Sequence, residues 1–529
     1  MTTSDAIATP RPGPRPRLVS DIVRHWATTT PDAEAVAYEG TTWTWAQWDD
    51  RARRVSGALA AAGIGRGDRV AFVDKNHPAC LEVTLGASAV GAANAVVNWR
   101  LAPDELVYVL GDAAPRLLFV GADLVPAWEA VHERLPGITT VVVVGGEQDT
   151  YEAFLAAATP ADAAPDVEPD DTALVLYTSG TTGFPKGATL THRGLVAHTV
   201  ALRSDFPMGP GDRNLVAMPL FHVGGSCYAL VGFDAGVPTT VLREVTGPGL
   251  VGSFLGGCTH AFLVPAVIAG LVQAGAPALG ALARLKILGY GASPAPLPVL
   301  RAAMEACPAT DFLQVYGMTE LSGVVTTLKP AAHRDAARPE RLASAGTPIP
   351  GVELRVVDPA TGEDVPPGTP GELWWRTEQR MGGYLNKPEA TAETITPDGY
   401  VRSGDVGRVD DGGFVFIEDR VKDMIITGGE NVYGPEVERV LVEHPSIAEA
   451  VVVGVPDDVW GEAVKAIVVP AEGHTVDAAQ VVAYAREHLA GYKCPRSVDV
   501  VEAFPRNATG KILKNVLRRP YWEGTGRSI

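Results

Sequence analysis

The order of apolar and polar positions divides the chain into regions with different textures. From about Leu18 to Thr326, short apolar runs typical of strands alternate with Ala-rich stretches typical of helices. The runs 69–73, 116–120 and 139–144 each belong to such a unit. This alternation predicts a large N-terminal domain built from parallel α/β layers.

After Pro330 the pattern changes to short strands that are separated by Gly, Pro and Asp. The segments "VELRVVD", "GELWWRT", "YVRSGDVGRVD" and "GFVFIED" predict a small β-barrel-like module with antiparallel strands over residues 325–419. From about Asp423 the α/β pattern returns with "AEAVVVGV", "EAVKAIVVP" and the helix-like "DAAQVVAYAREHLA". We expect a mobile tail at 1–17, the large domain at 18–419, a hinge at 420–422 and a small mobile α+β lid domain at 423–529.

Composition supports a multidomain globular protein. A chain of 529 residues is too long for one compact core, and its 46% hydrophobic and 20% charged residues are typical of a soluble protein. The net charge of −18 argues against general binding to nucleic acid or to anionic membranes. No run reaches about 18 uninterrupted apolar residues, so we expect no transmembrane helix.

The first residues and the cysteines bear on where the protein works. The segment "MTTSDAIATPRPGPRPR" lacks the apolar core of a secretory signal. The five cysteines are scattered, with no CxxC pair, which is typical of reduced and buried thiols. We expect a cytoplasmic protein, and a homo-oligomer is possible.

The segment "YTSGTTGFPKGATLTH" (177–192) carries the first chemical indication. Its glycines let backbone N–H groups approach a ligand, its hydroxyls donate and accept hydrogen bonds, and Lys186 adds one positive charge. It differs from the nucleotide P-loop, because Lys186 follows Pro185 and a strand-like run comes next. The pattern favours a mobile phosphate-covering loop between two strands, and a solvated turn is the alternative.

Further motifs follow in a fixed order. They are "GYGASP" (289–294), "QVYGMTE" (314–320), "GYLNKPEAT", "YVRSGDVGRVDDGGFVFIEDRVKDMIITGGENVYGPEVE" and "PRNATGKILK" (505–514). Together with the segment at 177–192 they resemble the adenylate-forming superfamily of acyl-CoA synthetases, luciferases and peptide-synthetase adenylation domains. The resemblance covers nearly the whole chain, and "ITGGENVY" is more similar to the acyl-CoA synthetase branch.

The resemblance implies a site for ATP and Mg²⁺. Thr178 and Glu320 would hold Mg²⁺, a hard cation that prefers oxygen ligands. Lys511 would lie between the attacking carboxylate and the α-phosphate and oppose their repulsion. The residues implied to bind ATP or CoA are Thr178, Ser179, Gly180, Thr181, Thr182, Gly183, Lys186, Gly291, Ala292, Ser293, Gln314, Val315, Tyr316, Gly317, Met318, Thr319, Asp405, Arg420, Lys422, Gly428, Gly429 and Lys511.

Several of these positions belong to the C-terminal part of the pattern. Asp405 and Arg420 would contact the ribose, although Ser403 and Asp419 stand where the family more often has Thr and Gly. Lys422 matches the hinge about which the small domain swings between two poses. Beyond it, Gly428 and Gly429 would leave room for the pantetheine arm of CoA.

The run "MPLFHVGGSCYAL" (218–230) resembles the wall of an acyl pocket. His222 would sit near the carboxylate as a gate, and a hydrogen-bonded core histidine is the alternative. The small residues Gly224, Gly225, Gly291, Ala292 and Gly323 suggest room for a bulky acyl group. The candidate pocket residues are His222, Val223, Gly225, Val264, Gly291, Gly317, Met318 and Gly323, with Val315 and Val324 as further apolar walls.

The resemblance implies an AMP-forming acid–thiol ligase that activates a medium- or long-chain fatty acid, an aryl acid or a sterol-derived acid. CoA is the expected acceptor, because no carrier-protein segment follows in this sequence. An adenylating enzyme that uses an amine, a carrier protein or nitrite is the first alternative. A non-enzymatic nucleotide-bound scaffold is the second, and the joint presence of Lys186, Glu320 and Lys511 argues against it.

Overall fold

The computed structural model describes residues 15–178, 185–421, 423–427, 430–457, 460–506 and 512–523, without the side chains at 430 and 431. The chain forms two compact units. The first comprises Met1–Glu353 and Trp375–Val401, and the second comprises Leu354–Trp374 and Arg402–Ile529, as far as these ranges are described. Within those ranges, no helix combines the length and the apolar character needed to cross a membrane.

One sheet of the first unit has seven strands, which are, in spatial order, β18 (Gly383–Tyr384), β8 (Lys186–Thr191), β7 (Thr172–Thr178), β4 (Ala93–Val97), β3 (Arg69–Val73), β5 (Leu117–Gly121) and β6 (Thr140–Val144). The five strands from β7 to β6 are mutually parallel, while β8 runs antiparallel to both β7 and β18. Every residue of β4 and β5 is buried, as expected for parallel strands that are covered on both faces. The predicted parallel α/β layers are confirmed.

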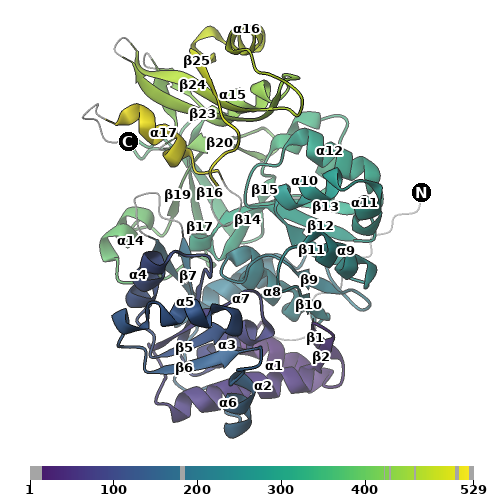
Figure 1. Cartoon of the computed structure of the whole chain (residues 1–529), viewed down its shortest axis with the longest axis vertical. Helices are drawn as coiled ribbons and strands as arrows, with labels where there is room; N and C mark the ends of the chain where they lie inside the picture. Colours follow the sequence, from purple (N-terminus) through teal and green to yellow (C-terminus); the bar gives the residue numbers. More distant parts are fainter. Residues whose placement is uncertain are drawn as a thin grey trace. The chain divides into compact units, whose positions relative to one another are not determined.

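The other sheet of the first unit has nine strands, which are, in spatial order, β15 (Thr347–Pro348), β14 (Gly323–Leu328), β13 (Asp311–Met318), β12 (Ile287–Gly291), β11 (His260–Leu263), β9 (Asn214–Val216), β10 (Thr239–Val241), β1 (Glu34–Tyr38) and β2 (Thr41–Thr44). The central strands are parallel, and antiparallel pairs lie at both edges. Because β12 and β13 are parallel neighbours, the motifs at their carboxyl ends meet at one edge of the sheet (Figure 1).

Helices surround both sheets of the first unit. They are α1 (Val19–Thr29), α2 (Trp45–Ala61), α3 (Pro78–Ala89), α4 (Pro103–Ala113), η1 (Ala122–Leu124), α5 (Val125–Glu129), η2 (His132–Arg134), α6 (Tyr151–Ala157), α7 (His192–Ala201), α8 (Val223–Ala235), α9 (Gly247–Leu255), α10 (Pro265–Gln273), α11 (Ala276–Leu282), α12 (Leu297–Ala306), η3 (Thr319–Leu321), α13 (Pro330–His333), η4 (Pro339–Ala343) and α14 (Pro388–Thr394). Hydrogen bonds from nearby side chains cap the starts of some of these helices. For example, Thr44 and Gln47 form a capping box at the start of α2.

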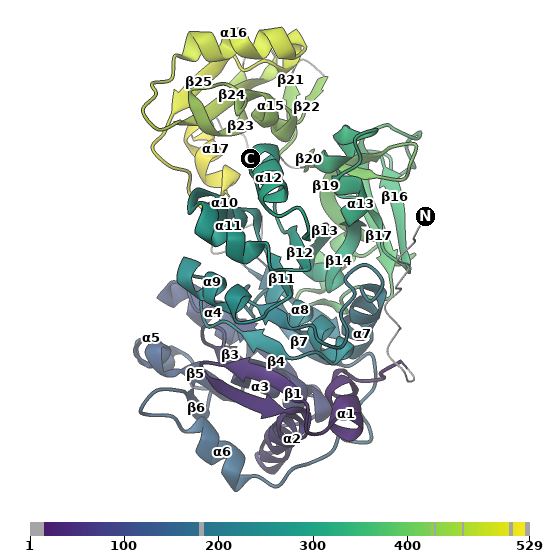
Figure 2. The same cartoon turned by 90° about the vertical axis from the view of Figure 1, so that its right-hand side faces the viewer.

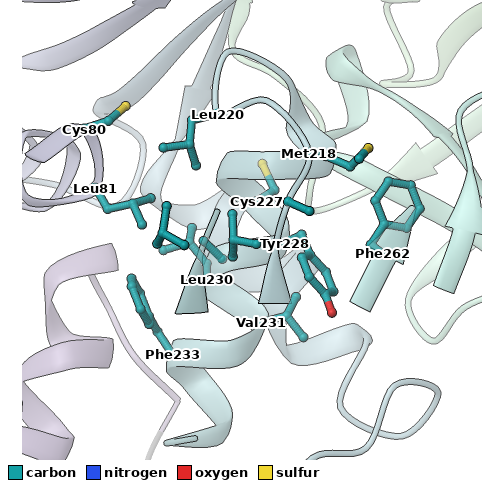
Figure 3. Close-up of a cluster of buried hydrophobic side chains, with 14 of the residues drawn as sticks. Cys80, Leu81, Met218, Leu220, Cys227, Tyr228, Leu230, Val231, Phe233 and Phe262 are labelled. Carbon is teal, nitrogen blue, oxygen red and sulfur yellow. The ribbon is translucent and has the colours of Figure 1, made fainter. Parts of the chain in front are cut away.

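Two helices lie inside the core of the first unit. All residues of α3 are buried, and so are residues 225–234 of α8. A helix that is apolar on all sides is expected to be enclosed by other elements. Figure 3 shows side chains of α8, among them Cys227 and Phe233, packed with Cys80 and Leu81 of α3 and with side chains from neighbouring strands and loops.

The second unit contains most of a four-stranded sheet, which is, in spatial order, β16 (Val352–Val357), β17 (Gly371–Thr377), β19 (Val401–Val409) and β20 (Val415–Arg420). The pair β19–β20 is antiparallel, as the turn-rich pattern after Pro330 predicts. In the described part of the chain, this sheet is open, with β16 and β20 at its edges.

The rest of the second unit is the expected α+β fold. Its strands are β21 (Ile425–Thr427), β22 (Glu430–Val432), β23 (Ile447–Asp457), β24 (Gly461–Pro470) and β25 (Ser497–Val500). Its helices are α15 (Gly434–Leu441), α16 (Ala478–His488), η5 (Gly491–Lys493) and α17 (Lys514–Trp522). The two long strands and α16 coincide with the runs that the sequence analysis quoted. Figure 2 shows α15 and α16 packed on the sheet, whose two longest strands, β23 and β24, are antiparallel.

Candidate active site

The strands around the hydroxyl-rich segment have the predicted arrangement. Thr178 ends β7, Lys186 begins β8, and these two residues are partners in the antiparallel register. The hydroxyl of Thr178 donates to the carbonyl oxygen of Lys186 at 3.4 Å. The segment therefore leaves and re-enters the sheet through adjacent strands, as predicted, and it does not lead into a helix. The loop residues Ser179, Gly180, Thr181, Thr182 and Gly183 lie outside the described residues.

Glu320 and Lys186 come close to the same aromatic side chain. Glu320 lies in η3, directly after β13, and its side chain is buried. The hydroxyl of Tyr384 donates to Oε1 of Glu320 at 2.6 Å, and the ammonium of Lys186 lies 4.8 Å from the centre of the Tyr384 ring. Burial, together with the nearby Glu320, raises the pKa of Tyr384, so its hydroxyl stays protonated at neutral pH.

The sequence analysis quoted the motif that contains Tyr384 but gave this residue no role. Tyr384 lies 64 residues after Glu320 in the sequence, and no spacing rule connects the two. The connection arises because β18 pairs with β8, with Tyr384 opposite Ala188. A single tyrosine in a turn-rich segment is more often a packing residue, so the sequence carried no usable indication of this contact.

The motifs predicted on the nucleotide side lie on neighbouring strands. Gly291, at the end of β12, is paired with Val315 of β13, and Ala292 follows with φ of +68°, which is unusual for a residue that has a Cβ. A Cβ at Gly317 would lie 1.8 Å from a carbonyl oxygen of β14, so only glycine fits there. The described members of this predicted set are Gly291, Ala292, Ser293, Gln314, Val315, Tyr316, Gly317, Met318 and Thr319, which all belong to β12, β13 or the residues directly after them.

His222 sits at the start of α8. Its Nε2 atom is buried and has no hydrogen-bond partner among the described residues. Burial is the main cause that lowers the pKa of His222 to about 4, and the charge of Arg100 acts in the same direction. The imidazole is therefore neutral at pH 7. The alternative was a core histidine held by hydrogen bonds, and no such bond is found at Nε2 among the described residues. The role of His222 as a gate stays a prediction.

Three of the small residues predicted at the acyl pocket have other atoms packed closely against them. A Cβ at Gly225 would lie 2.2 Å from a carbonyl oxygen of the preceding turn, and one at Gly291 would lie 2.2 Å from a carbonyl oxygen of β13. A Cβ at Gly224 would lie 2.8 Å from the ring of Phe262. A larger side chain at Gly225 or Gly291 would collide with the backbone, so glycine serves close packing there. That these residues also leave volume for a bulky acyl group stays a prediction. The further predicted pocket residues Val223, Val264, Val315, Met318 and Val324 are all half-buried.

Two buried polar side chains near this region were not singled out from the sequence. Both ring nitrogens of His198 and the hydroxyl of Tyr228 lack hydrogen-bond partners among the described residues. His198 faces the backbone of Gly323, where a Cβ would lie 2.7 Å from Nε2. Tyr228 packs against the rings of Phe206 and Phe262 (Figure 3). Unpaired buried groups are costly, so they are candidates for contact with a ligand.

In the second unit, the two residues predicted at the ribose form a pair. Asp405 of β19 is opposite Arg420 of β20, and Nε of Arg420 lies 2.7 Å from Oδ1 of Asp405. The hydroxyl of Ser403 donates to the carbonyl oxygen of Leu373 at 2.7 Å and accepts from the backbone N–H of Asp405 at 3.1 Å. Serine at this position therefore supplies the hydroxyl that fixes the turn before Asp405.

Asp419 and Lys514 form a second charged cluster in the same unit. Asp419 accepts from the backbone N–H groups of Arg420 and Gly434, both at 2.7 Å, and burial raises its pKa to about 6. Nζ of Lys514 lies 2.8 Å from Oε1 of Glu438. Burial by itself would lower the pKa of Lys514, but the charges of Glu438 and Asp419 raise it. The Asp419 that replaces the usual glycine thus connects β20 to the start of α15.

Some predicted site residues cannot be placed. Lys422, Gly428, Gly429 and Lys511 lie outside the described residues, as do those of the loop at 179–184. Lys514, which follows Lys511 by three positions, is described. The predicted roles of these residues in the hinge, in CoA binding and in charge stabilisation stay predictions.

The residues predicted to hold a metal suit Mg²⁺ that is bound together with a nucleotide. No group of three or more His, Cys, Asp or Glu side chains gathers in the ranges that the structure covers. The candidate donors are the carboxylate of Glu320 and the hydroxyl of Thr178, which are both oxygen ligands. Mg²⁺ is usually held by one or two carboxylates, substrate phosphates and water, so this small donor set fits.

A cavity of about 230 Å³ lies elsewhere in the first unit, between α1, α2 and α3. It contains none of the predicted site residues. Arg24 bridges Asp49 and Asp162, and Arg53 also contacts Asp162. The remaining charged side chain, Asp21, accepts from the backbone N–H groups of Arg17 and Leu18. Each charged side chain of this cavity therefore already has a partner within the protein.

Comparisons with known proteins agree with this arrangement. A family model described as AMP-binding enzyme matches residues 23–385, and a model described as AMP-binding enzyme C-terminal domain matches residues 436–511. The chain is 38% identical over 507 residues to the fatty acid–[acyl-carrier-protein] ligase ScoC of Streptomyces coeruleorubidus, covering 94% of this chain and 95% of that protein.

Two further proteins show how varied the relatives are. A feruloyl-CoA synthase of an Amycolatopsis species is 37% identical over 496 residues, covering 93% of this chain and 96% of that protein. The crystal structure of ATP-bound MatB from Rhodopseudomonas palustris has a TM-score of 0.87 and 30% identity, covering 95% of this chain and 99% of that chain.

Proposed function

Because the chain belongs to the AMP-binding enzyme family, we propose that it uses ATP to activate a carboxylic acid and then passes the acyl group to the thiol of CoA. The acid's carboxylate oxygen attacks the α-phosphorus of ATP, and pyrophosphate leaves. The thiol then attacks the acyl carbon, AMP leaves, and the thiol proton is released. The acid is a fatty or an aryl acid, in keeping with the relatives named above.

The observation that carries this proposal is that Lys186 and Glu320 both contact Tyr384, Lys186 over its ring and Glu320 at its hydroxyl. Lys186 makes no ion pair with a described carboxylate, and its charge is free to meet phosphate oxygens. Glu320 keeps its Oε2 atom free of hydrogen bonds within the described part of the chain. Mg²⁺, when it is bound, neutralises phosphate charge and favours the loss of pyrophosphate.

The other residues serve binding and charge stabilisation. Asp405 and Arg420 suit the hydroxyls of the ribose, and Tyr316 offers a half-buried aromatic face to the adenine. Lys511 supplies the cation between the carboxylate and the α-phosphate. The attacking carboxylate is already ionised near pH 7, so the first step needs no general base. Positioning and charge neutralisation are sufficient for phosphoryl transfer of this kind.

The experiment is a product analysis with a panel of fatty and aryl acids. The protein is incubated with ATP, Mg²⁺ and each acid, with and without CoA, and pyrophosphate, AMP and thioester are quantified by mass spectrometry. We expect pyrophosphate and AMP with at least one acid, and thioester when CoA is present. Release of ADP and inorganic phosphate, or no turnover with any acid, contradicts the proposal.

A carrier protein is the second candidate for the acceptor. The observation in its favour is the 38% identity to a fatty acid–[acyl-carrier-protein] ligase over nearly the whole chain. The same assay, with a phosphopantetheinylated carrier protein in place of CoA, separates the two acceptors. Pyrophosphate without CoA thioester, together with acyl carrier protein, favours this candidate.

A further inference from the structure

One tyrosine touches both of the opposite charges that the proposed nucleotide site contains. The hydroxyl of Tyr384 donates to Oε1 of Glu320 at 2.6 Å. The ammonium of Lys186 lies 4.8 Å from the centre of the same ring. We propose that Tyr384 is a positioning residue that presents Glu320 to Mg²⁺ and Lys186 to the phosphates of ATP. This inference rests on the proposed function.

The backbone around Tyr384 is fixed from two sides. On one side, the N–H of Leu385 donates to the carbonyl oxygen of Gly187 at 2.7 Å, within the pairing of β18 with β8. On the other side, the N–H of Tyr384 donates to the hydroxyl of Thr391 at 2.8 Å. The tyrosine ring is therefore held to the same strand that begins with Lys186.

The hydrogen bond from Tyr384 leaves one carboxylate oxygen of Glu320 available to a metal. The N–H of Met381 donates to the carbonyl oxygen of Glu320 at 2.8 Å and fixes its main chain, while Tyr384 occupies Oε1. Oε2 receives no hydrogen bond from the described residues and is the oxygen available to a metal. A hydrogen bond that orients a carboxylate ligand in this way typically affects metal affinity strongly.

The contact with Lys186 holds the ammonium without neutralising it. A cation over an aromatic face is attracted to the ring but keeps its charge. If Lys186 instead paired directly with Glu320, each charge would satisfy the other and neither would be available to Mg²⁺ or phosphate. The tyrosine therefore keeps the two charges apart while it orders both of them.

The same unit offers a matched control. Tyr400 also places its hydroxyl near a carboxylate, 3.4 Å from Oε2 of Glu353, and carries the guanidinium of Arg376 4.8 Å above its ring. None of these three residues belongs to the predicted site. Here the cation and the carboxylate pair directly with each other and are both exposed. The variant Tyr400→Phe therefore removes a tyrosine hydroxyl beside a carboxylate and a cation outside the predicted site, and it reports on structural effects alone.

The experiment measures ATP binding by isothermal titration calorimetry, with full-length protein and no acid or CoA, in Mg²⁺ and in EDTA. The variant Tyr384→Phe keeps the ring and loses the hydroxyl. We expect its affinity for ATP in Mg²⁺ to fall about 10-fold, the usual scale for a residue that orients a metal ligand. In EDTA its affinity should match that of the wild type.

The variant Tyr384→Leu removes the ring as well. We expect its affinity for ATP to fall in EDTA too, by roughly 3-fold, which corresponds to the loss of an ordered cation over an aromatic ring. Tyr400→Phe should bind ATP like the wild type under both conditions. Thermal unfolding of each variant, followed by circular dichroism, confirms that the proteins compared are folded.

Two kinds of failure are distinguishable. If the wild-type protein binds ATP in a Mg²⁺-dependent manner and Tyr384→Phe does the same with equal affinity, the inference about Tyr384 is overturned and the proposed function stands. An equal loss of affinity in Mg²⁺ and in EDTA also overturns it, because the effect is then not on the metal. If the wild-type protein does not bind ATP at all, the proposed function fails.

Discussion

Lys186 in the first unit and Lys514 in the second have opposite kinds of neighbours. Lys186 lies over the ring of Tyr384 and makes no ion pair with a described carboxylate. Lys514 is paired with Glu438 at 2.8 Å, and its pKa is raised by Glu438 and Asp419. Both lysines belong to motifs that suggest nucleotide chemistry, but one charge is left available and the other is satisfied internally.

This difference separates charges that serve a ligand from charges that serve the fold. A buried ion pair that is fully satisfied has little left to offer a substrate, and breaking it leaves an unpaired charge in the interior. A cation held by an aromatic ring costs the fold little when it is removed. The two lysines should therefore respond in opposite ways to the same substitution, which gives the comparison a direct test.

The largest effect is expected for Lys514→Met. This change leaves the half-buried Glu438 and the buried Asp419 without their cation, so we expect the free energy of unfolding of the second unit to fall by about 2–3 kcal/mol. Chemical denaturation followed by tryptophan fluorescence measures it. The matched control is Lys493→Met. Lys493 is about as exposed as Lys514, but its partner Glu436 is more exposed than Glu438 and Asp419, so this variant should cost no more than about 1 kcal/mol. Equal costs for the two variants would remove the distinction between the lysines.

Lys186→Met should show the reverse behaviour. Loss of a cation aimed at phosphate oxygens is expected to lower kcat/KM for ATP by about 100-fold. The unfolding free energy should change by no more than about 0.5 kcal/mol, since no carboxylate loses a partner. Steady-state kinetics of pyrophosphate release and chemical denaturation of the same sample measure the two quantities. A stable variant with unchanged kcat/KM would show that this charge does not meet ATP.

His198 extends the comparison to an uncharged group. Burial lowers the pKa of His198 from its ordinary value of 6.5 to about 4, so the unfolded chain takes up a proton first as the pH falls. The contribution of neutral His198 to the free energy of unfolding is fully present above pH 6.5. It decreases as the pH falls from 6.5 to 4, and about 2 kcal/mol of it is lost at pH 5.

The variants His198→Leu and His198→Gln both remove this titration. We expect each of them to lose about 2 kcal/mol less than the wild type between pH 7 and pH 5, as measured by denaturation at the two pH values. Agreement between the two variants separates titration from packing. If both variants lose as much stability as the wild type between pH 7 and pH 5, His198 already takes up a proton in the folded state over this range, which contradicts the account.

The smallest effect is expected at Ser403. Its hydroxyl holds the turn before Asp405 through two hydrogen bonds, so Ser403→Ala should raise KM for ATP by roughly 5-fold, which corresponds to about 1 kcal/mol. Ser403→Thr keeps the hydroxyl and should change KM by less than about 2-fold. A larger effect of threonine than of alanine would contradict the role of the hydroxyl.

The sequence predicted the elements of this fold well and the contacts between distant motifs poorly. The runs 69–73 and 447–457 are strands in the structure. They could be predicted because the apolar pattern that marks such a strand involves only residues that are close together in the sequence. The return of the chain from Thr178 to Lys186 through adjacent strands was also predictable, because Pro185 disfavours helical geometry for the residue before it and a strand-like run follows.

The contacts that the sequence missed depend on strand pairing across long intervals. Tyr384 reaches Glu320 because β18 adds to the edge of β8, and no periodicity in the sequence encodes that pairing. The surroundings of the glycines in the acyl region also depend on distant segments. From sequence, Gly224 signals only a missing side chain, and the structure shows that the ring of Phe262 lies next to it.

The most direct test of the proposed chemistry follows the oxygen atoms of the acid. A carboxylic acid that the enzyme accepts is labelled with ¹⁸O in both carboxylate positions and is converted to thioester with ATP and CoA. If the carboxylate attacks the α-phosphorus, one labelled oxygen remains on that phosphorus, and mass spectrometry should find AMP that is heavier by one ¹⁸O. Unlabelled AMP, with the label in pyrophosphate or retained by the acid, would contradict an acyl-adenylate intermediate.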